Sequence, residues 1–269
     1  MAARFREVKK HLYRRMKYRL LRPEPPALPE PFSGPVVVVG SAPVSHKPAD
    51  FDESFRVITI NGSQVVTKAW GVEVPDVALV QFNQIEGTNT NAVEVRRVLN
   101  GERVKMLYVL LWRDGRKRLE DGLKAFDYRY DNLQIVDRYR RMALLDRVVG
   151  MQCSELGSDD KCSNGINAVL FALHNGATAV IITGINPDSG GHIYNQENLA
   201  RLHIHKDREI LLRLMERGYP VFTADPAVSQ SLGLPLWEGK ARARQMSEGS
   251  GKAACPVSKP ATVLNPSLG

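Results

Sequence analysis

Cysteine is scarce in this chain, and long apolar runs are absent from it. The 269 residues include three cysteines, Cys153, Cys162 and Cys255, whose spacing fits neither a disulfide framework nor a zinc site. No apolar run approaches the roughly 18 to 20 residues that cross a bilayer, and the first residues lack the apolar core of a secretory signal. We therefore expect a cytoplasmic protein that is either soluble or peripheral to the inner face of the membrane.

Acidic residues are nearly missing from the N-terminal segment, residues 1–22. It contains nine Lys and Arg against one Glu, in a chain of net charge +8. As a helix it has an apolar stripe flanked by cations, made of Phe5, Val8, Leu12, Met16 and Leu20. Such a helix binds an anionic membrane, although a helix that packs its stripe on the domain fits the pattern equally well. Charge alone supports a nucleic-acid-binding protein, and because no nucleic-acid-reading motif follows, we expect no nucleic acid partner.

Prolines and short apolar runs divide the rest of the chain. Residues 23–34 are proline-rich and predict an extended linker. Short β-branched runs then alternate with helical patterns over residues 35–238, which predicts a single Rossmann-like α/β/α domain with a mainly parallel sheet. Within it, residues 112–161 are charged and hard to divide, so apart from a helix over residues 138–149 we expect less regular structure and a small lid there. The small and polar composition of residues 239–269 predicts a disordered tail.

Small or amide-bearing residues follow three of the predicted strands. Gly40, Ser41 and Ala42 come after the first strand, Asn61 after the second and Asn83 after the third. Amide side chains donate and accept hydrogen bonds without carrying charge. Because parallel strands bring their carboxyl ends to one edge of a sheet, we expect a shared ligand crevice there. Taken singly, each Asn has a simpler interpretation as a turn or cap residue.

Residues 161–207 are the centre of this expected site. Ser163, Asn164 and Gly165 open an apolar helix, and the buried strand 179–183 follows it. A helix N-terminus offers backbone N–H groups that bind phosphate or carboxylate. The loop after that strand is rich in Gly, His and Asn, so we expect part of the ligand site in it.

These ordered motifs resemble the sialyltransferases that use sugars activated by cytidine monophosphate (CMP), most closely the small bacterial type and more distantly the eukaryotic type. In that family a small turn after the first strand meets the donor, as Gly40 and Ser41 would here. Its next two strands end in Asn and in an aromatic residue followed by Asn, as at Asn61 and at Phe82 and Asn83. A Ser-Gly loop then opens a helix, and the strand after it ends in Gly-Ile-Asp; here residues 163–165 and 184–186 correspond.

The resemblance, which covers about residues 36–223, implies a glycosyltransferase of polysaccharide or lipopolysaccharide biosynthesis. It would move an acidic keto-sugar from a CMP donor to a hydroxyl of a glycan or glycolipid acceptor, with inversion and without a metal or other cofactor. It implies that Tyr194 holds the donor phosphate and that His203, or the neighbouring His205, is the general base. It assigns nucleotide-sugar binding to Gly40, Ser41, Ala42, Asn61, Asn83, Ser163, Asn164, Gly165 and Asn186.

Departures from the family pattern keep alternatives open. Ser41 and Ala42 replace Asn and Gly, and Asn186 replaces Asp, so a second donor sugar, of the Kdo type, stays open beside sialic acid. His203, His205 and Asp207 also provide ligand types that suit a first-row metal, although neighbouring side chains in such a turn point apart. A non-catalytic nucleotide- or sugar-binding α/β protein would keep the sheet without the chemistry.

Overall fold

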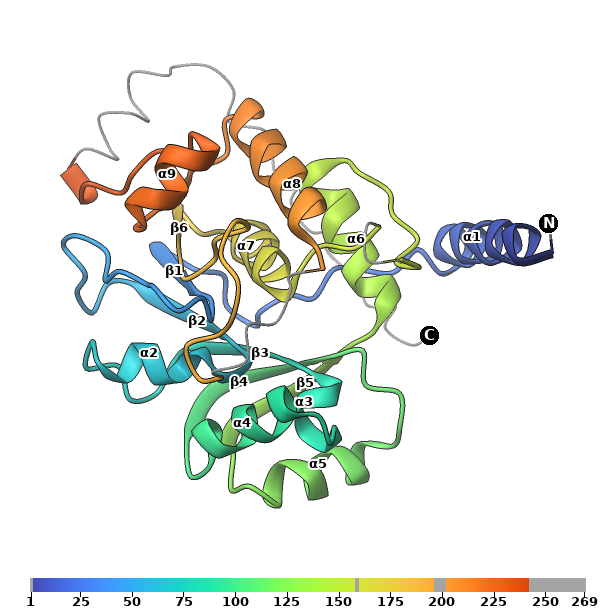
Figure 1. Ribbon diagram of the computed structural model, residues 1–269, viewed down its shortest axis with the longest axis horizontal. Coiled ribbons are helices and arrows are strands. Elements are labelled where there is room, and N and C mark those ends of the chain that lie inside the picture. The colour runs from blue at the N-terminus through green and yellow to red at the C-terminus, as the bar shows by residue number, and fades with distance from the viewer. Residues whose placement is uncertain (1, 158–159, 196–201, 242–269) are drawn as a thin grey trace, which may run out of the picture.

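Seven parallel strands form one sheet in the computed structural model, which describes residues 2–157, 160–195 and 202–241 (Figure 1). The strand order is β5-β4-β3-β2-β1-β6-β7, and every neighbouring pair is parallel. The predicted α/β class is therefore confirmed. The strands are β1 (Pro35–Val39), β2 (Arg56–Ile60), β3 (Val77–Gln81), β4 (Arg103–Leu110), β5 (Arg129–Val136), β6 (Ala179–Thr183) and β7 (Val221–Thr223).

Helices cover both faces of this sheet. Side chains alternate along a strand, so Val36 and Val38 face one side and Val37 and Val39 the other, and all four are fully buried. The first side packs on α6 (Arg138–Val149), α7 (Asn164–His174), α8 (Ile204–Glu216) and α9 (Pro226–Leu232). The second packs on α2 (Gln64–Lys68), α3 (Phe82–Glu86), α4 (Thr90–Leu99) and α5 (Arg116–Lys124) (Figure 1).

Strand β1 lies where the order of the sheet reverses. The chain runs outward from β1 through β2, β3, β4 and β5, and then returns to place β6 and β7 on the other side of β1. Val39, the last residue of β1, is in register with Thr59 of β2 and Thr183 of β6. Open α/β sheets bind ligands beyond the carboxyl ends of the strands at such a reversal.

Residues 112–161 contain more regular structure than the sequence predicts. The predicted helix over residues 138–149 is α6, whereas α5 and β5 were not predicted, and the irregular part is the segment after α6, which begins at Gly150. Sequence reasoning misses β5 because this edge strand pairs only with β4 and exposes polar residues such as Asp131 and Asn132. An edge strand with one solvated face lacks the continuous apolar run that identifies a central strand. The lid and the domain bounds stay predictions.

The proline-rich residues 23–34 contain no helix or strand, and they pack on the domain. The backbone N–H of Leu28 donates to Oδ1 of Asn175 at 2.7 Å, and the Tyr108 hydroxyl donates to the Ala27 carbonyl at 2.9 Å. The Phe32 ring lies edge-on against Phe171 with 6.5 Å between ring centroids. These contacts attach the segment to the ends of α7 and β4, so it is a strap on the domain and not a loose spacer.

Helix α1 (Ala2–Leu21) extends to one side of the domain (Figure 1). Arg14 donates to the carbonyl oxygens of Ser154 and Glu155, and the Tyr18 hydroxyl donates to Asp146 at 2.9 Å. The apolar stripe stays in solvent, with Phe5 74% and Leu20 80% exposed. The alternative in which this stripe packs on the domain is therefore wrong. Of the described helices, none is both long and apolar enough to cross a bilayer. Most of the predicted tail, residues 242–269, lies outside the described residues.

Candidate functional site

A cavity of about 380 Å³ opens at the carboxyl edge of the sheet. Its walls come from the ends of β1, β2, β3 and β4 and from the N-termini of α7 and α8. Eight of the predicted site residues line it: Gly40, Ser41, Asn61, Asn83, Ser163, Asn164, Gly165 and His203. Residues that lie as far apart in the sequence as Gly40 and His203 thus share one cavity, which we call the edge cavity.

Four other predicted site residues are not part of the cavity wall. Ala42 is buried, and Asn186 uses its Oδ1 to accept the backbone N–H of Asp188 at 2.9 Å within its own loop. His205 is exposed on α8. Tyr194 is buried behind His192, with the two rings stacked and their centroids 5.3 Å apart.

The backbones of β1 and β6 come into contact at the base of the edge cavity. The N–H of Gly40 donates to the Thr183 carbonyl at 2.8 Å, and the N–H of Ala42 donates to the Gly184 carbonyl at 2.9 Å. A Cβ atom at Gly40 would overlap the Gly184 carbonyl oxygen and the Ile185 side chain. Gly184 has φ of +62°, a conformation that glycine adopts without strain. Both glycines are therefore required by the geometry of this contact.

Asp225 stabilises the end of β6 through hydrogen bonds. This buried carboxylate accepts the backbone N–H of Gly184 at 2.7 Å and the Thr183 hydroxyl at 2.9 Å. The Nδ1 of His46 lies 2.8 Å from the same carboxylate. Hydrogen bonds to a charged acceptor are the stronger kind, so Asp225 holds Gly184 in place against β1.

Two strand ends at the cavity adopt the left-handed backbone conformation without being glycine. Asn61 has φ of +51°, and its Oδ1 accepts the N–H of Gln81 at 3.0 Å, which joins the ends of β2 and β3. Leu111, just after β4, has φ of +63°. Asn tolerates this region, whereas a leucine in it is strained. Backbone strain of this kind persists where the surrounding structure imposes it, and it is frequent at ligand sites.

The N-terminus of α7 faces the cavity through Ser163, Asn164 and Gly165. The Ser163 hydroxyl caps the helix by accepting the N–H of Ile166, and the Ser163 N–H donates to Oδ1 of Asp207 at 2.8 Å. The N–H groups of Asn164 and Gly165 have no partner within an α-helix that begins here. They offer hydrogen bonds to an anion, as the motif predicts.

Two cations that sequence reasoning missed also line the edge cavity, Arg141 and Lys161. Arg141 lies on α6 among the apolar residues Leu144, Leu145 and Val148, and its side chain is 4% exposed. That spacing is the signal in the sequence, because an arginine on the buried face of a helix needs a specific partner. The amides Gln84 and Asn91 were missed as well.

The histidines of the site differ in position. His203 precedes the first turn of α8, is partly buried and lines the cavity, whereas His205 does not. His192 lines the cavity too, and its Nδ1 lies 2.7 Å from the Ser41 hydroxyl. The alternative metal set of His203, His205 and Asp207 does not gather, and in the parts of the chain that the structure describes no three His, Cys, Asp or Glu side chains do.

No protein-family model matches the sequence, and no curated protein does. Among solved structures, the chain is similar to the monofunctional α-2,3-sialyltransferase Cst-I from Campylobacter jejuni, with 13% identity over 76% of this chain and 80% of that one and a TM-score of 0.48. It is also similar to the sialyltransferase CstII of the same organism in complex with CMP-3FNeuAc, with 11% identity over 75% and 85% of the two chains and a TM-score of 0.44. The likeness lies in the fold, and these enzymes are of the kind that the sequence motifs resemble.

Gly40→Ala is expected to damage both stability and the site. The added methyl group must push the ends of β1 and β6 apart, and such overpacking costs about 1 to 3 kcal/mol of unfolding free energy. The melting temperature should fall by several degrees, because a loss of about 1 kcal/mol of unfolding free energy corresponds to roughly 2 to 4 °C in a domain of this size.

Gly115→Ala is the matched control. Gly115 precedes α5 with φ of −63°, and a Cβ atom there would meet no atom within 4 Å. The Gly115→Ala substitution should lower the unfolding free energy by at most about 1 kcal/mol, the usual scale of a change at a helix cap. Equal melting temperatures for the Gly40→Ala variant and the wild type would contradict the close contact.

Proposed function

We propose that this chain transfers an acidic keto-sugar, of the sialic acid or Kdo type, from a CMP donor to a hydroxyl of a glycan or glycolipid, as an inverting enzyme that needs no metal. The observation that carries the proposal is the convergence of the predicted motif residues on the edge cavity. Three strand ends and the N-terminus of α7 meet there, in the order that the motif pattern requires. A cavity of about 380 Å³ is within the usual range for a small-molecule site.

The groups on the cavity wall suit a nucleoside monophosphate. Asn61, Gln81 and Asn83 carry donors and acceptors that can pair with a base or a ribose. Arg141, Lys161 and the first N–H groups of α7 carry positive charge or partial positive charge, which favours a phosphate and an acidic sugar.

His203 is the proposed general base. In a single displacement the acceptor oxygen attacks the anomeric carbon, the bond from that carbon to the phosphate oxygen breaks, and the imidazole takes the acceptor proton. CMP leaves with the electron pair of the broken bond, and the configuration inverts. Histidine is the side chain most often used to accept such a proton in general base catalysis. Tyr194 is buried behind His192, so its contact with the departing phosphate, which the resemblance implies, would require His192 to move aside when the donor binds. Tyr194→Phe should cost less than loss of His203 because it removes one donor among several.

Calorimetric titration with cytidine, uridine, guanosine and adenosine monophosphates, in the presence of a chelator, tests the donor. We expect CMP to bind at least about tenfold more tightly than the other three, because a site that pairs with base-edge groups discriminates by at least one hydrogen bond. A preference for the uridine or adenine nucleotide would exclude the proposed donor. Hydrolysis of CMP-sialic acid or CMP-Kdo without acceptor separates an enzyme from a non-catalytic binding protein.

His203→Ala should lower turnover by about 10²- to 10⁴-fold, the usual contribution of a general base, while CMP affinity stays nearly intact. The matched control is His205→Ala, because His205 is exposed and does not line the cavity. Steady-state rates with CMP-sialic acid and an acceptor glycan measure the difference. If His203→Ala keeps wild-type turnover and His205→Ala loses it, the base is His205.

We also propose that α1 holds the enzyme at an anionic membrane surface, where a lipid-linked acceptor is found. The apolar stripe of α1 is exposed, and most of the nine Lys and Arg of residues 1–22 lie on the same helix. Each cation near such a surface contributes about 1 kcal/mol, and the buried apolar stripe adds to this. Arg14 and Tyr18 attach α1 to the domain, so the membrane would hold the whole enzyme.

Full-length protein should co-sediment with vesicles that contain phosphatidylglycerol, and less as salt increases, because screening weakens surface charges. Val8→Ser combined with Leu12→Ser and Met16→Ser should weaken the partition by about 100-fold, since three apolar contacts are lost. Val44→Ser combined with Val93→Ser, which changes exposed apolar residues of the domain, is the control. Equal sedimentation of the stripe variant and the wild type would disprove membrane binding through α1.

A further inference from the structure

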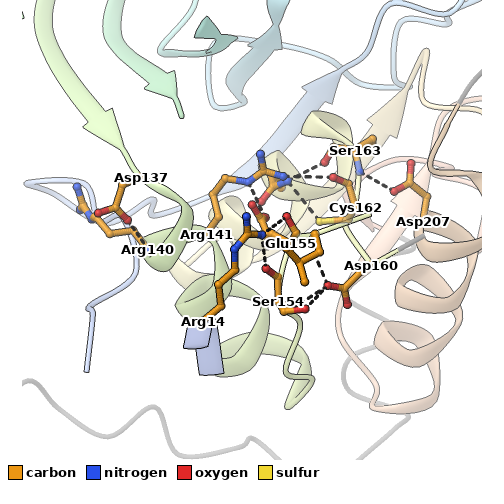
Figure 2. A network of polar contacts seen from close by, with 12 residues as sticks. Arg14, Asp137, Arg140, Arg141, Ser154, Glu155, Asp160, Cys162, Ser163 and Asp207 are labelled. Atoms are coloured by element: carbon orange, nitrogen blue, oxygen red, sulfur yellow. Dashed lines mark hydrogen bonds and ion pairs between the residues drawn. The ribbon is translucent and has the colours of Figure 1, made fainter. Parts of the chain in front are cut away.

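A buried ion pair stands at the wall of the edge cavity, between Arg141 and Glu155. The Nε of Arg141 lies 3.1 Å from Oε1 of Glu155, and both side chains are 4% exposed. The Nη2 of Arg141 also donates to the Cys162 carbonyl at 3.3 Å, immediately before Ser163 and the start of α7 (Figure 2). This pair therefore places a guanidinium beside the N–H groups of α7.

Burying this ion pair costs folding free energy, so its presence calls for a functional reason. Two buried charges lose their hydration, and apolar residues of similar volume often stabilise a protein as well or better. Burial raises the pKa of the Glu155 carboxyl and Arg141 opposes that rise. Glu155 also has φ of +51°, a strained conformation for this residue type. Glu155 does not line the edge cavity, but its partner Arg141 does, and strain beside a buried charge at a cavity is typical of residues that are held for binding.

Contacts from α1 hold Glu155 in this strained position. Arg14 donates to the Ser154 carbonyl at 2.7 Å and to the Glu155 carbonyl at 2.6 Å (Figure 2). Asp160 accepts the Ser154 N–H at 2.9 Å and the Ser154 hydroxyl at 2.7 Å. The segment that carries Glu155 is thus fixed from both sides.

We propose that Arg141 binds the anionic group of the ligand, a phosphate or a carboxylate, jointly with the first N–H groups of α7, and that Glu155 positions Arg141 for this contact. The identity of the ligand's nucleoside rests on the proposed function, whereas the contact between Arg141 and an anionic group does not. Arg141 lines the edge cavity while its Nη2 donates to the Cys162 carbonyl and its Nε faces Glu155 as an ion pair without a hydrogen bond. A planar guanidinium held in this way presents its remaining N–H donors in a fixed direction, as pairing with two anion oxygens requires.

The local charges leave donors for an anion at the start of α7. Arg141 and Lys161 both line the edge cavity, and the carboxylates of Glu155 and Asp207 balance them, with Asp207 itself on the cavity wall. Asp207 accepts the Ser163 N–H, whereas the first N–H groups of α7 carry partial positive charge. The attraction for an anion therefore comes from these N–H groups together with Arg141, and not from an excess of cations.

The test compares ligands that differ by one anionic group. Cytidine, CMP and CMP-sialic acid add first a phosphate and then a carboxylate, and calorimetry measures each affinity. The variant is Arg141→Gln with Glu155→Gln, which removes both charges together, because loss of Arg141 alone would leave a buried carboxylate unpaired and risk misfolding. Thermal unfolding reports whether the double variant folds.

We expect the double variant to bind cytidine as the wild type does. It should bind the ligand that carries the anionic group contacted by Arg141, either CMP or CMP-sialic acid, about 10- to 100-fold more weakly. A loss that starts at CMP assigns the phosphate, and a loss that starts at CMP-sialic acid assigns the carboxylate. Glu155→Gln should keep most of the anion-dependent gain, because its amide oxygen is still a polar partner for the Arg141 guanidinium at the same place. Arg141→Lys should lose most of it, because an ammonium lacks the planar fork.

Arg147→Gln is the control on the same helix, since Arg147 is 54% exposed and points to Glu24. Equal weakening of cytidine, CMP and CMP-sialic acid, or no weakening, would overturn the role of Arg141. The same nucleoside and monophosphate pairs with uracil, guanine and adenine separate this result from the donor assignment. If a nucleotide with another base binds best, the proposed CMP donor is wrong, and its gain in affinity from nucleoside to monophosphate still tests a phosphate contact by Arg141. A wild type that gains affinity neither from the phosphate nor from the carboxylate of CMP-sialic acid overturns the role of Arg141 as well.

Discussion

The contact between Gly40 and Gly184 is the constraint on which the site depends. It brings the backbones of β1 and β6 together where the strand order reverses, and any side chain at Gly40 would occupy the space of the Gly184 carbonyl. Asp225 holds the β6 side of the contact through the N–H of Gly184. Because both strands end at this point, the loops that follow them must diverge, and the edge cavity is the space that they leave.

A chain of polar contacts leads from α1 to this cavity. Arg14 holds the Glu155 backbone, Glu155 pairs with Arg141, and Arg141 donates to the carbonyl that precedes Ser163 (Figure 2). On the far side, the Ser163 N–H donates to Asp207 of α8. Three helices and the start of a fourth are therefore joined by charged or hydrogen-bonded groups. In a protein interior such contacts are electrostatically strong, so the N-terminus of α7 is held rigidly.

The parts of the fold that a sequence predicts well are those with a strong local signal. The runs at 36–39 and 179–183 correspond to β1 and β6 because a central parallel strand, buried on both faces, must be apolar throughout. The start of α7 is evident from Ser163, a good N-cap, and its end from Gly176, which has φ of +86°. By contrast, β5 gives no such signal, since its exposed face admits charged residues.

The sequence by itself determined the parallel α/β class and the residues that follow each strand, because burial period and turn chemistry are local properties. It therefore indicated Asn61, Asn83 and Ser163 as neighbours in one crevice. Only the tertiary structure decided that Arg141 reaches the cavity while Tyr194 is buried behind His192. It also decided that the apolar stripe of α1 stays in solvent. These outcomes depend on how elements far apart in the sequence pack, and a periodic pattern says which face of a helix is apolar but not what covers it.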